Sequence, residues 1–408
     1  MRILHTSDWH LNDNLGFQPR QGDIVDRLQE IAAYLEEYRV DVMVVAGDVF
    51  SERYQKPEDW RKAIEDVNTV FKPFLLRGGT IVAISGNHDN EAFFNLLRFS
   101  LDLASPIDPE KTRLRPSGRL YLAAQPTSLL LQGKSGQQVQ FLLVPYPTVQ
   151  RYLKDETAHY NSLEEKNRFL HQAMLDRITR MQSRLDPKLR SVLVGHAHIR
   201  GSQIHNLYRI SEREDVVFDS SDLSTHWEYG AFGHIHKPQS LLNTNHIRYS
   251  GSIERLDAGE KDDNKSVVFV EIGANGRTEE PILLPLNATP IYKVKIRNPE
   301  TDIAQLYDLS LYPEPERALV SYELTYTPGE HNRDAICQEI EQLFPRYFHR
   351  KIEVFGAVST LTTDVDLTNR QDAPSTARQY LQTHLADHHD REAILALYET
   401  LLAQETVS

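Results

Sequence analysis

The chain has 408 residues and a formal net charge of −13, because 58 Asp and Glu outnumber 45 Lys and Arg. At roughly 150 residues per domain, this length predicts two or three domains, and an apolar content of 40% is typical of a globular protein rather than a disordered one. Cys337 is the only cysteine, which excludes an intramolecular disulfide and a thiolate zinc cage.

No apolar run approaches the ~20 residues that a membrane helix needs, and the chain opens on a strand-like segment without the pattern of a signal peptide. Together with the single cysteine, this predicts a cytoplasmic protein with no membrane segment. An acidic chain binds nucleic acid poorly by itself. A DNA substrate would therefore require metal ions, a local basic surface or a partner to offset the repulsion.

Short apolar runs alternate with amphipathic stretches over residues 1–285. Five runs rich in β-branched residues predict buried strands, at 2–6, 42–46, 80–84, 141–144 and 191–194. Apolar residues at helical spacing predict helices over 24–38 and 160–185. This alternation is typical of α/β folds, in which functional residues gather where loops leave the carboxyl ends of the strands.

The pattern changes after residue 285 to that of a small α+β domain. Its predicted elements are strand, helix, strand, helix and strand, at 291–296, 302–311, 318–326, 333–344 and 351–355. A polar link over 364–376 leads to two amphipathic helices, predicted at 375–386 and 391–404. We therefore predict domains over 1–285, 286–360 and 361–408.

Five loop motifs follow predicted strands and carry candidate metal ligands. They are Asp8-Trp9-His10, Gly47-Asp48, Gly86-Asn87-His88-Asp89, Gly195-His196-Ala197-His198 and Gly233-His234-Ile235-His236. Each motif alone is a weak signal, because Gly-Asp after a strand is a common turn and a lone His-x-His is more often packed or solvated. Their occurrence together, in this order and after successive strands, favours a functional interpretation.

Carboxylate, imidazole and amide ligands without sulfur suit divalent ions such as Mn²⁺, so the motifs predict a pair of metal ions in one crevice. Asp48 is the expected bridge, because its two oxygens can bind two ions that lie ~3.5–4 Å apart. Asp8 and His10 lie two residues apart and can face the same ion. The glycines before Asp48, Asn87, His196 and His234 are expected to let the backbone approach the ions.

These motifs resemble the D-x-H, GD, GNH, GH and GHxH pattern of the calcineurin-like metallophosphoesterases. Their flanking residues are similar to those of the double-strand-break repair nucleases in that superfamily, the branch that includes the nuclease subunit of the bacterial SbcCD complex. The similarity is carried by 4–11, 86–89, 232–239, Tyr249-Ser250-Gly251-Ser252, Gly259-Glu260 and Lys265-Ser266. It implies a four-layer α/β/β/α fold, a β-sandwich flanked by helices, with a small α+β capping domain and C-terminal helices.

The resemblance also implies a role for each matching residue. The first metal would be held by Asp8, His10, Asp48 and His236, and the second by Asp48, Asn87, His196 and His234. His88 would contact the scissile phosphate and help the leaving oxygen depart, with Asp89 orienting it. His198, two residues after a ligand, is expected to be a bystander.

The implied activity is Mn²⁺-dependent cleavage of DNA in repair and recombination, as an exonuclease on duplex ends and an endonuclease on single strands and hairpins. The implied partners are DNA, an SbcC-type coiled-coil ATPase gripped by the C-terminal helices, and a second copy of the chain. One alternative is a phosphoesterase acting on phosphoproteins or small phosphoesters. The other is a non-enzymatic scaffold, although all seven ligand positions and His88 hold competent side chains.

Several other features have both a structural and a functional interpretation. The basic segments 111–119 and 346–351 are either solvated surface or contacts to DNA phosphates. Residues Phe93, Phe94, Leu97 and Phe99 are either core or a dimer face. We expect His5 and Cys337 to be buried in the core, and His384, His388 and His389 to be solvated near a helix end.

Overall fold

The computed structural model describes residues 1–51, 56–108, 113–153, 160, 162–204, 216–219, 227–241, 244–355 and 394–398. The chain divides into two compact units, Met1–Glu353 and Val354–Ser408. Of the predicted C-terminal helices only 394–398 are described, and these residues are helical. Several predicted features lie outside the described residues: the rest of both helices, the link over 364–376, residues 111–112, and the histidines His384, His388 and His389. The boundaries predicted at 285 and 360 stay a prediction.

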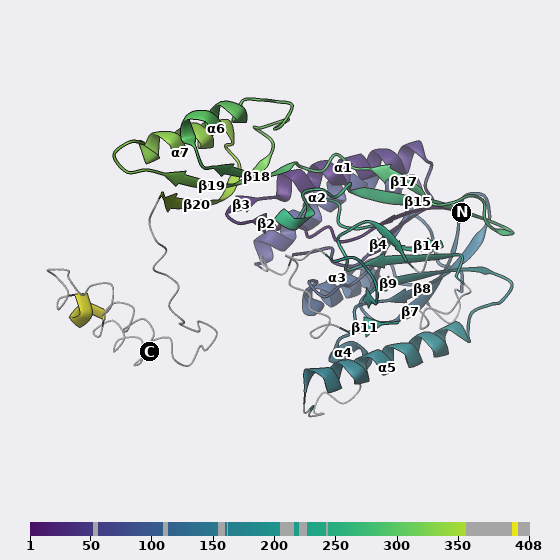
Figure 1. The fold of residues 1–408 in the computed structure, drawn as a ribbon. Helices are drawn as coiled ribbons and strands as arrows, with labels where there is room; N and C mark the ends of the chain where they lie inside the picture. Colours follow the sequence, from purple (N-terminus) through teal and green to yellow (C-terminus); the bar gives the residue numbers. More distant parts are fainter. Residues whose placement is uncertain are drawn as a thin grey trace. The chain divides into compact units, whose positions relative to one another are not determined.

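A seven-stranded sheet lies in the first unit (Figure 1). Its strands are β16 (Gly276–Arg277), β15 (Ser266–Gly273), β1 (Arg2–Thr6), β4 (Val42–Ala46), β5 (Thr80–Ile84) and β6 (Leu120–Ala123), with β17 (Ile282–Pro285) beside β15. Strands β1, β4, β5 and β6 run parallel to one another. The strands predicted at 2–6, 42–46 and 80–84 are therefore confirmed to the residue.

A six-stranded sheet packs against the first one. Its order is β13 (Gln239–Leu241), β14 (Thr244–Tyr249), β12 (Tyr229–Gly233), β9 (Arg190–His196), β8 (Gln138–Val144) and β7 (Thr127–Gln132). Strands β14, β12, β9 and β8 are parallel. The facing sides share one buried core, to which β1 and β4 contribute Ile3 and Val44 and β8 and β9 contribute Phe141 and Val192.

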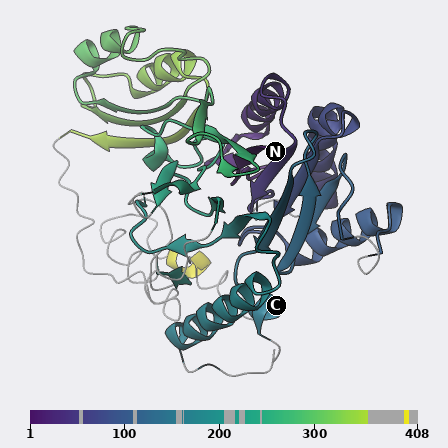
Figure 2. The same ribbon diagram turned by 90° about the vertical axis from the view of Figure 1, so that its right-hand side faces the viewer.

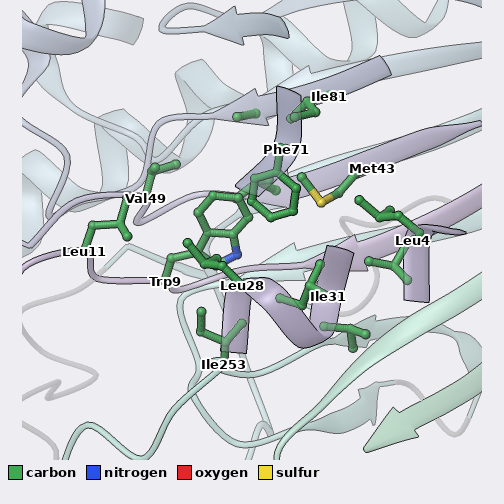
Figure 3. Close-up of a cluster of buried hydrophobic side chains, with 14 of the residues drawn as sticks. Leu4, Trp9, Leu11, Leu28, Ile31, Met43, Val49, Phe71, Ile81 and Ile253 are labelled. Atoms are coloured by element: carbon green, nitrogen blue, oxygen red, sulfur yellow. The ribbon is translucent and has the colours of Figure 1, made fainter. Parts of the chain in front are cut away.

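Helices cover the two outer faces of this sandwich (Figures 1 and 2). The first sheet is covered by α1 (Gln21–Glu37), α2 (Pro57–Leu76) and α3 (Glu91–Ala104), whose apolar side chains share a core with β1, β4 and β5 (Figure 3). The second sheet is covered by α5 (Leu163–Gln182), which follows the short α4 (Val149–Tyr152). The layers are thus α/β/β/α, as expected, and none of the described helices is long and apolar enough to cross a membrane.

The small domain has the elements β18 (Ile291–Ile296), α6 (Pro299–Leu306), β19 (Leu319–Tyr326), α7 (Arg333–Leu343) and β20 (Tyr347–Val354). Its three strands form one sheet over a core of its own, which includes Cys337 and Phe344. Strand β20 begins four residues before its predicted start at 351, inside a basic segment. The reason is that Phe348 packs on Leu15 and Leu319, contacts that the local charge pattern does not reveal.

Arg346 joins the small domain to helix α1. Its guanidinium donates two hydrogen bonds to the Asp23 carboxylate, at 2.9 and 2.6 Å, and a third to the Arg317 carbonyl oxygen. Arg346 is therefore occupied in packing rather than available to a DNA phosphate, which corrects one interpretation of the basic segment. The interpretation stays a prediction for Arg350 and Lys351, whose ion pairs to Glu341 and Glu353 are exposed.

Candidate metal centre

The five motif loops meet at the carboxyl ends of strands from both sheets. Asp8 and His10 follow β1, Asp48 follows β4, and Asn87 and His88 follow β5 in the first sheet. His196 ends β9, and His234 and His236 follow β12 in the second. The contacts that join the sheets here include a hydrogen bond from the His234 backbone N–H to Asp8 Oδ1 at 3.0 Å and a contact of 2.7 Å between His196 Nδ1 and the Ala46 carbonyl oxygen. The predicted ligands therefore come together in one place.

Four of these residues have a left-handed backbone. The φ angles are +50° at Asp8, +46° at His10, +50° at Asp48 and +103° at His234. Such angles are uncommon outside glycine and cost about 1–3 kcal/mol each, so they persist where packing enforces them, often at functional sites. Trp9 supplies such packing, because it is buried beside Leu11 and stacks on Phe71 with ring centroids 5.5 Å apart (Figure 3).

One potential metal-binding group consists of Asp8, His10 and His236, which offer ligand atoms that all lie within 4.8 Å of one another. All three side chains are buried. His10 Nε2 has no hydrogen-bond partner among the described residues and lies 3.6 Å from Asp48 Oδ2. A buried polar atom without a partner is costly, and a cation at this position would satisfy it. This group, with Asp48, fits the ligand set expected for the first metal.

The adjacent group consists of Asp8, Asp48 and His196, again within 4.8 Å of one another. His196 Nε2 lies 3.2 Å from Asp48 Oδ2 and 2.9 Å from Asn87 Oδ1. The same amide oxygen lies 2.9 Å from His234 Nδ1, so a chain of contacts connects the four residues expected at the second metal. Asp8 belongs to both groups, which the sequence did not indicate. Asp48, the expected bridge, has Oδ2 within reach of both His10 and His196.

Charge pairing in the centre sets the pKa values of its buried groups. Burial alone would lower the pKa of His196, but the Asp48 carboxylate beside it raises that pKa to about 9. Burial would raise the pKa of Asp48, and His196 and His88 instead hold it well below its usual range. In the protein without metal, the positive charge of protonated His196 therefore compensates the negative charge of Asp48. Divalent ions binding here would displace that proton, as metals generally do at histidine ligands.

The centre is open to solvent on the side of Asn87 and His88, which are exposed and half-buried respectively. The backbone N–H of His88 donates to Asp48 Oδ1 at 2.9 Å, and the centroid of the His88 ring lies 5.0 Å from that of the His10 ring. Asp89 accepts hydrogen bonds from the backbone N–H groups of Gly86 at 2.7 Å and Phe50 at 2.9 Å. The bond from Gly86 lies within the loop that carries His88, and the bond from Phe50 ties this loop to the loop after β4.

Two of the motif glycines make room for side chains from other motifs. A Cβ on Gly86 would overlap the Asp48 carboxylate, and a Cβ on Gly47, where φ is +93°, would overlap the His196 ring. We expected the glycines to admit the ions to the backbone. Instead, the space beside Gly47 and Gly86 is filled by another ligand side chain, so glycine is needed for close packing of the loops.

The model of the calcineurin-like phosphoesterase family matches residues 1–238 of this chain. The chain belongs to that family. Curated relatives are described as nuclease subunits of SbcCD, and the one from Staphylococcus epidermidis is 27% identical over 67% of this chain and 67% of its own length. The corresponding protein of Bacillus subtilis is 25% identical over 76% of this chain and 75% of its own length. The corresponding protein of Escherichia coli is 26% identical over 68% of this chain and 66% of its own length.

Glu260 and Lys265 of this phosphoesterase contact the centre, and sequence reasoning assigned them no role. Glu260 Oε1 lies 2.9 Å from Nδ1 of His236, and its Oε2 lies 2.6 Å from the Lys265 ammonium. Burial would raise the pKa of Glu260, but the Lys265 ammonium and the hydrogen bond with His236 hold that pKa below its usual value. The only available signal was that Gly259-Glu260 and Lys265-Ser266 belong to the family resemblance.

Two further histidines are buried near the centre. His5 is fully buried, as expected, with Nδ1 2.8 Å from the Tyr229 hydroxyl. Burial, aided by the positive charge of Arg248, lowers the pKa of His5 to about 3, so it is neutral. His198 is also fully buried, and its ring centroid lies 6.3 Å from that of His234. It belongs to neither of the two potential metal-binding groups found among the described residues.

Proposed function

We propose that this chain is a metal-dependent DNA nuclease, an exonuclease on duplex ends and an endonuclease on single strands and hairpins. The observation that carries the proposal is the meeting of all seven expected ligands: five of them form two adjacent groups that share Asp8, and the Asn87 amide oxygen contacts both His196 and His234. The curated relatives, described as SbcCD nuclease subunits, support DNA as the substrate. By the same reasoning the chain works with an SbcC-type ATPase in DNA repair and recombination in the cytoplasm.

Two divalent ions, Mn²⁺ in this proposal, fit the ligands present. The first would be held by Asp8, His10, Asp48 and His236, and the second by Asp48, Asn87, His196 and His234. Bound there, such ions supply Lewis-acid chemistry that neutralises phosphodiester charge and activates a water. Every ligand is carboxylate, imidazole or amide, the donor types that suit Mn²⁺.

The chain itself positions the phosphate and moves a proton. The scissile phosphate enters on the open side, beside Asn87 and His88. The His88 ring gives a proton to the leaving oxygen. The hydrogen bond from the backbone N–H of His88 to Asp48 Oδ1 fixes the backbone that carries the ring. Asp89 positions His88 indirectly, because it accepts hydrogen bonds from backbone N–H groups that hold the loop carrying His88. The buried ligands exclude water from the rest of the centre.

A homodimer is part of the proposal, and helix α3 offers a face for it. Leu96, Phe99 and Leu103 are 64%, 59% and 85% exposed and are spaced three and four residues apart on one side of the helix. Phe94 faces the core, and Phe93 stacks on Trp60. The variant Phe99→Glu should shift the molar mass measured by light scattering from dimer to monomer. A dimer of unchanged stability would place the interface elsewhere.

The test of the nuclease activity uses labelled hairpin and blunt duplex DNA with Mn²⁺, with and without the ATPase. The wild-type chain should cleave DNA, and Asp48→Ala should abolish both cleavage and binding of metal ions. Asp262→Ala is the matched control, because this carboxylate is 80% exposed, and it should behave as wild type. Hydrolysis of nitrophenyl phosphate with no effect on DNA would favour the alternative, a phosphoesterase acting on phosphoproteins or small phosphoesters.

A further inference from the structure

A buried pair of charges lies behind His236, and the proposed reaction does not use it. The side chains of Glu260 and Lys265 are completely buried, and Lys265 Nζ lies 2.6 Å from Glu260 Oε2. The other carboxylate oxygen lies 2.9 Å from His236 Nδ1. We propose that Glu260, held by Lys265, is a positioning residue that fixes the proton of His236 on Nδ1 and strengthens Nε2 as a metal ligand. This inference rests on the proposed metal centre.

The hydrogen bonds around Glu260 and Lys265 hold the Glu260 carboxylate in one orientation. Lys265 Nζ donates to the His236 carbonyl oxygen and to Ser252 Oγ, both at 2.9 Å, and contacts Asp263 Oδ2 at 3.2 Å. Glu260 Oε2 also accepts from Ser252 Oγ and from the Leu256 N–H, both at 3.2 Å. With Oε2 held in this way, Oε1 is directed at the imidazole. Lys265 therefore holds the backbone of His236 directly and its ring through Glu260.

The position of the proton on His236 follows from this arrangement. An ionised carboxylate accepts hydrogen bonds and donates none, so Nδ1 of a neutral imidazole beside it carries the hydrogen. The lone pair then lies on Nε2, the nitrogen left for the group formed with Asp8 and His10. A carboxylate behind a ligating histidine also increases the basicity of the imidazole. Loss of such a partner typically weakens metal binding by roughly 10–100-fold.

Stability alone is a poor explanation for this pair. Removing two charges from water costs free energy that their attraction often fails to recover, so apolar residues of similar size commonly serve the fold as well. The same loop contains a second ion pair, between Lys261 and Asp262, at 2.6 Å on the exposed surface. Lys261 Nζ donates to both carboxylate oxygens of Asp262, and this exposed pair provides a matched control.

The first test needs no substitution at the pair. Nitrogen NMR of histidine-labelled, metal-free protein reports which ring nitrogen of His236 is protonated, with the signal assigned from its loss in His236→Gln. We expect protonation of Nδ1 and a bare Nε2. Protonation of Nε2 would overturn the proposal.

The second test measures metal affinity directly. In Glu260→Gln/Lys265→Met both charges are removed at nearly constant volume, and calorimetric titration should show one of two Mn²⁺ sites weakened by roughly 10–100-fold. Lys261→Met/Asp262→Asn should bind both ions as wild type does. A double variant that melts at a lower temperature but binds both ions normally would overturn the proposal in favour of a structural role. A wild-type chain that binds no Mn²⁺ would overturn the proposed metal centre itself.

Discussion

The ion pair between Asp48 and His196 predicts how the stability of the metal-free protein depends on pH. The pKa of His196 is about 9 in the folded protein, against 6.5 as its ordinary value. When folding raises the pKa of a histidine, the resulting stabilisation is fully present at pH values below the pKa of the unfolded chain. It is lost as the pH rises through the pKa of the folded protein. Each unit of pKa shift corresponds to about 1.4 kcal/mol. A buried pair of this kind therefore contributes about 3 kcal/mol to the free energy of unfolding at pH 6.5 and almost nothing at pH 9.5.

The substitution Asp48→Asn keeps the size of the side chain and removes its charge. Burial then dominates at His196 and its pKa falls, so this pH-dependent contribution disappears. The free energy of unfolding, measured with urea after removal of metal ions, should fall by about 3 kcal/mol more in wild type than in Asp48→Asn between pH 6.5 and 9.5. Asp89, whose pKa burial and Asp48 raise to about 6, is mostly ionised throughout this window and adds little to the change. Equal losses in the two proteins would refute the pairing.

Three further predictions test other parts of the molecule. His88→Asn should keep both Mn²⁺ sites in calorimetry while turnover falls by roughly 10²–10⁴-fold, and loss of a site would contradict a role on phosphate. Arg346→Met should lower the free energy of unfolding by about 2 kcal/mol, whereas Arg350→Met, in an exposed pair, should change it by less than about 1 kcal/mol. Deleting residues 370–408 should abolish co-purification with the ATPase and leave cleavage of single-stranded DNA intact, and retained binding at full affinity would contradict the role of this segment.

Much of the sandwich was predictable because its signals are local. Strands β4 and β5 are buried along their whole length and rich in β-branched residues, and β1 is buried from Ile3 to Thr6. Short apolar runs of this kind are visible without knowledge of their neighbours. The ligands were predictable for a related reason. Each motif lies directly after a strand, and parallel strands bring their carboxyl ends to one edge. Which residues hold which ion stays a proposal.

Short segments of sequence were sufficient to predict several central strands, the motif residues and the family resemblance, because each of these signals is local. The pairing of charges, by contrast, depends on contacts that form only in the folded chain. Arg346 looked like part of a basic surface, but its partner Asp23 lies 323 residues away. Glu260 was one acidic residue among 58 until the fold buried it between Lys265 and His236. The strength of a charge interaction depends on burial and on distance in space, and neither can be read from positions along the chain.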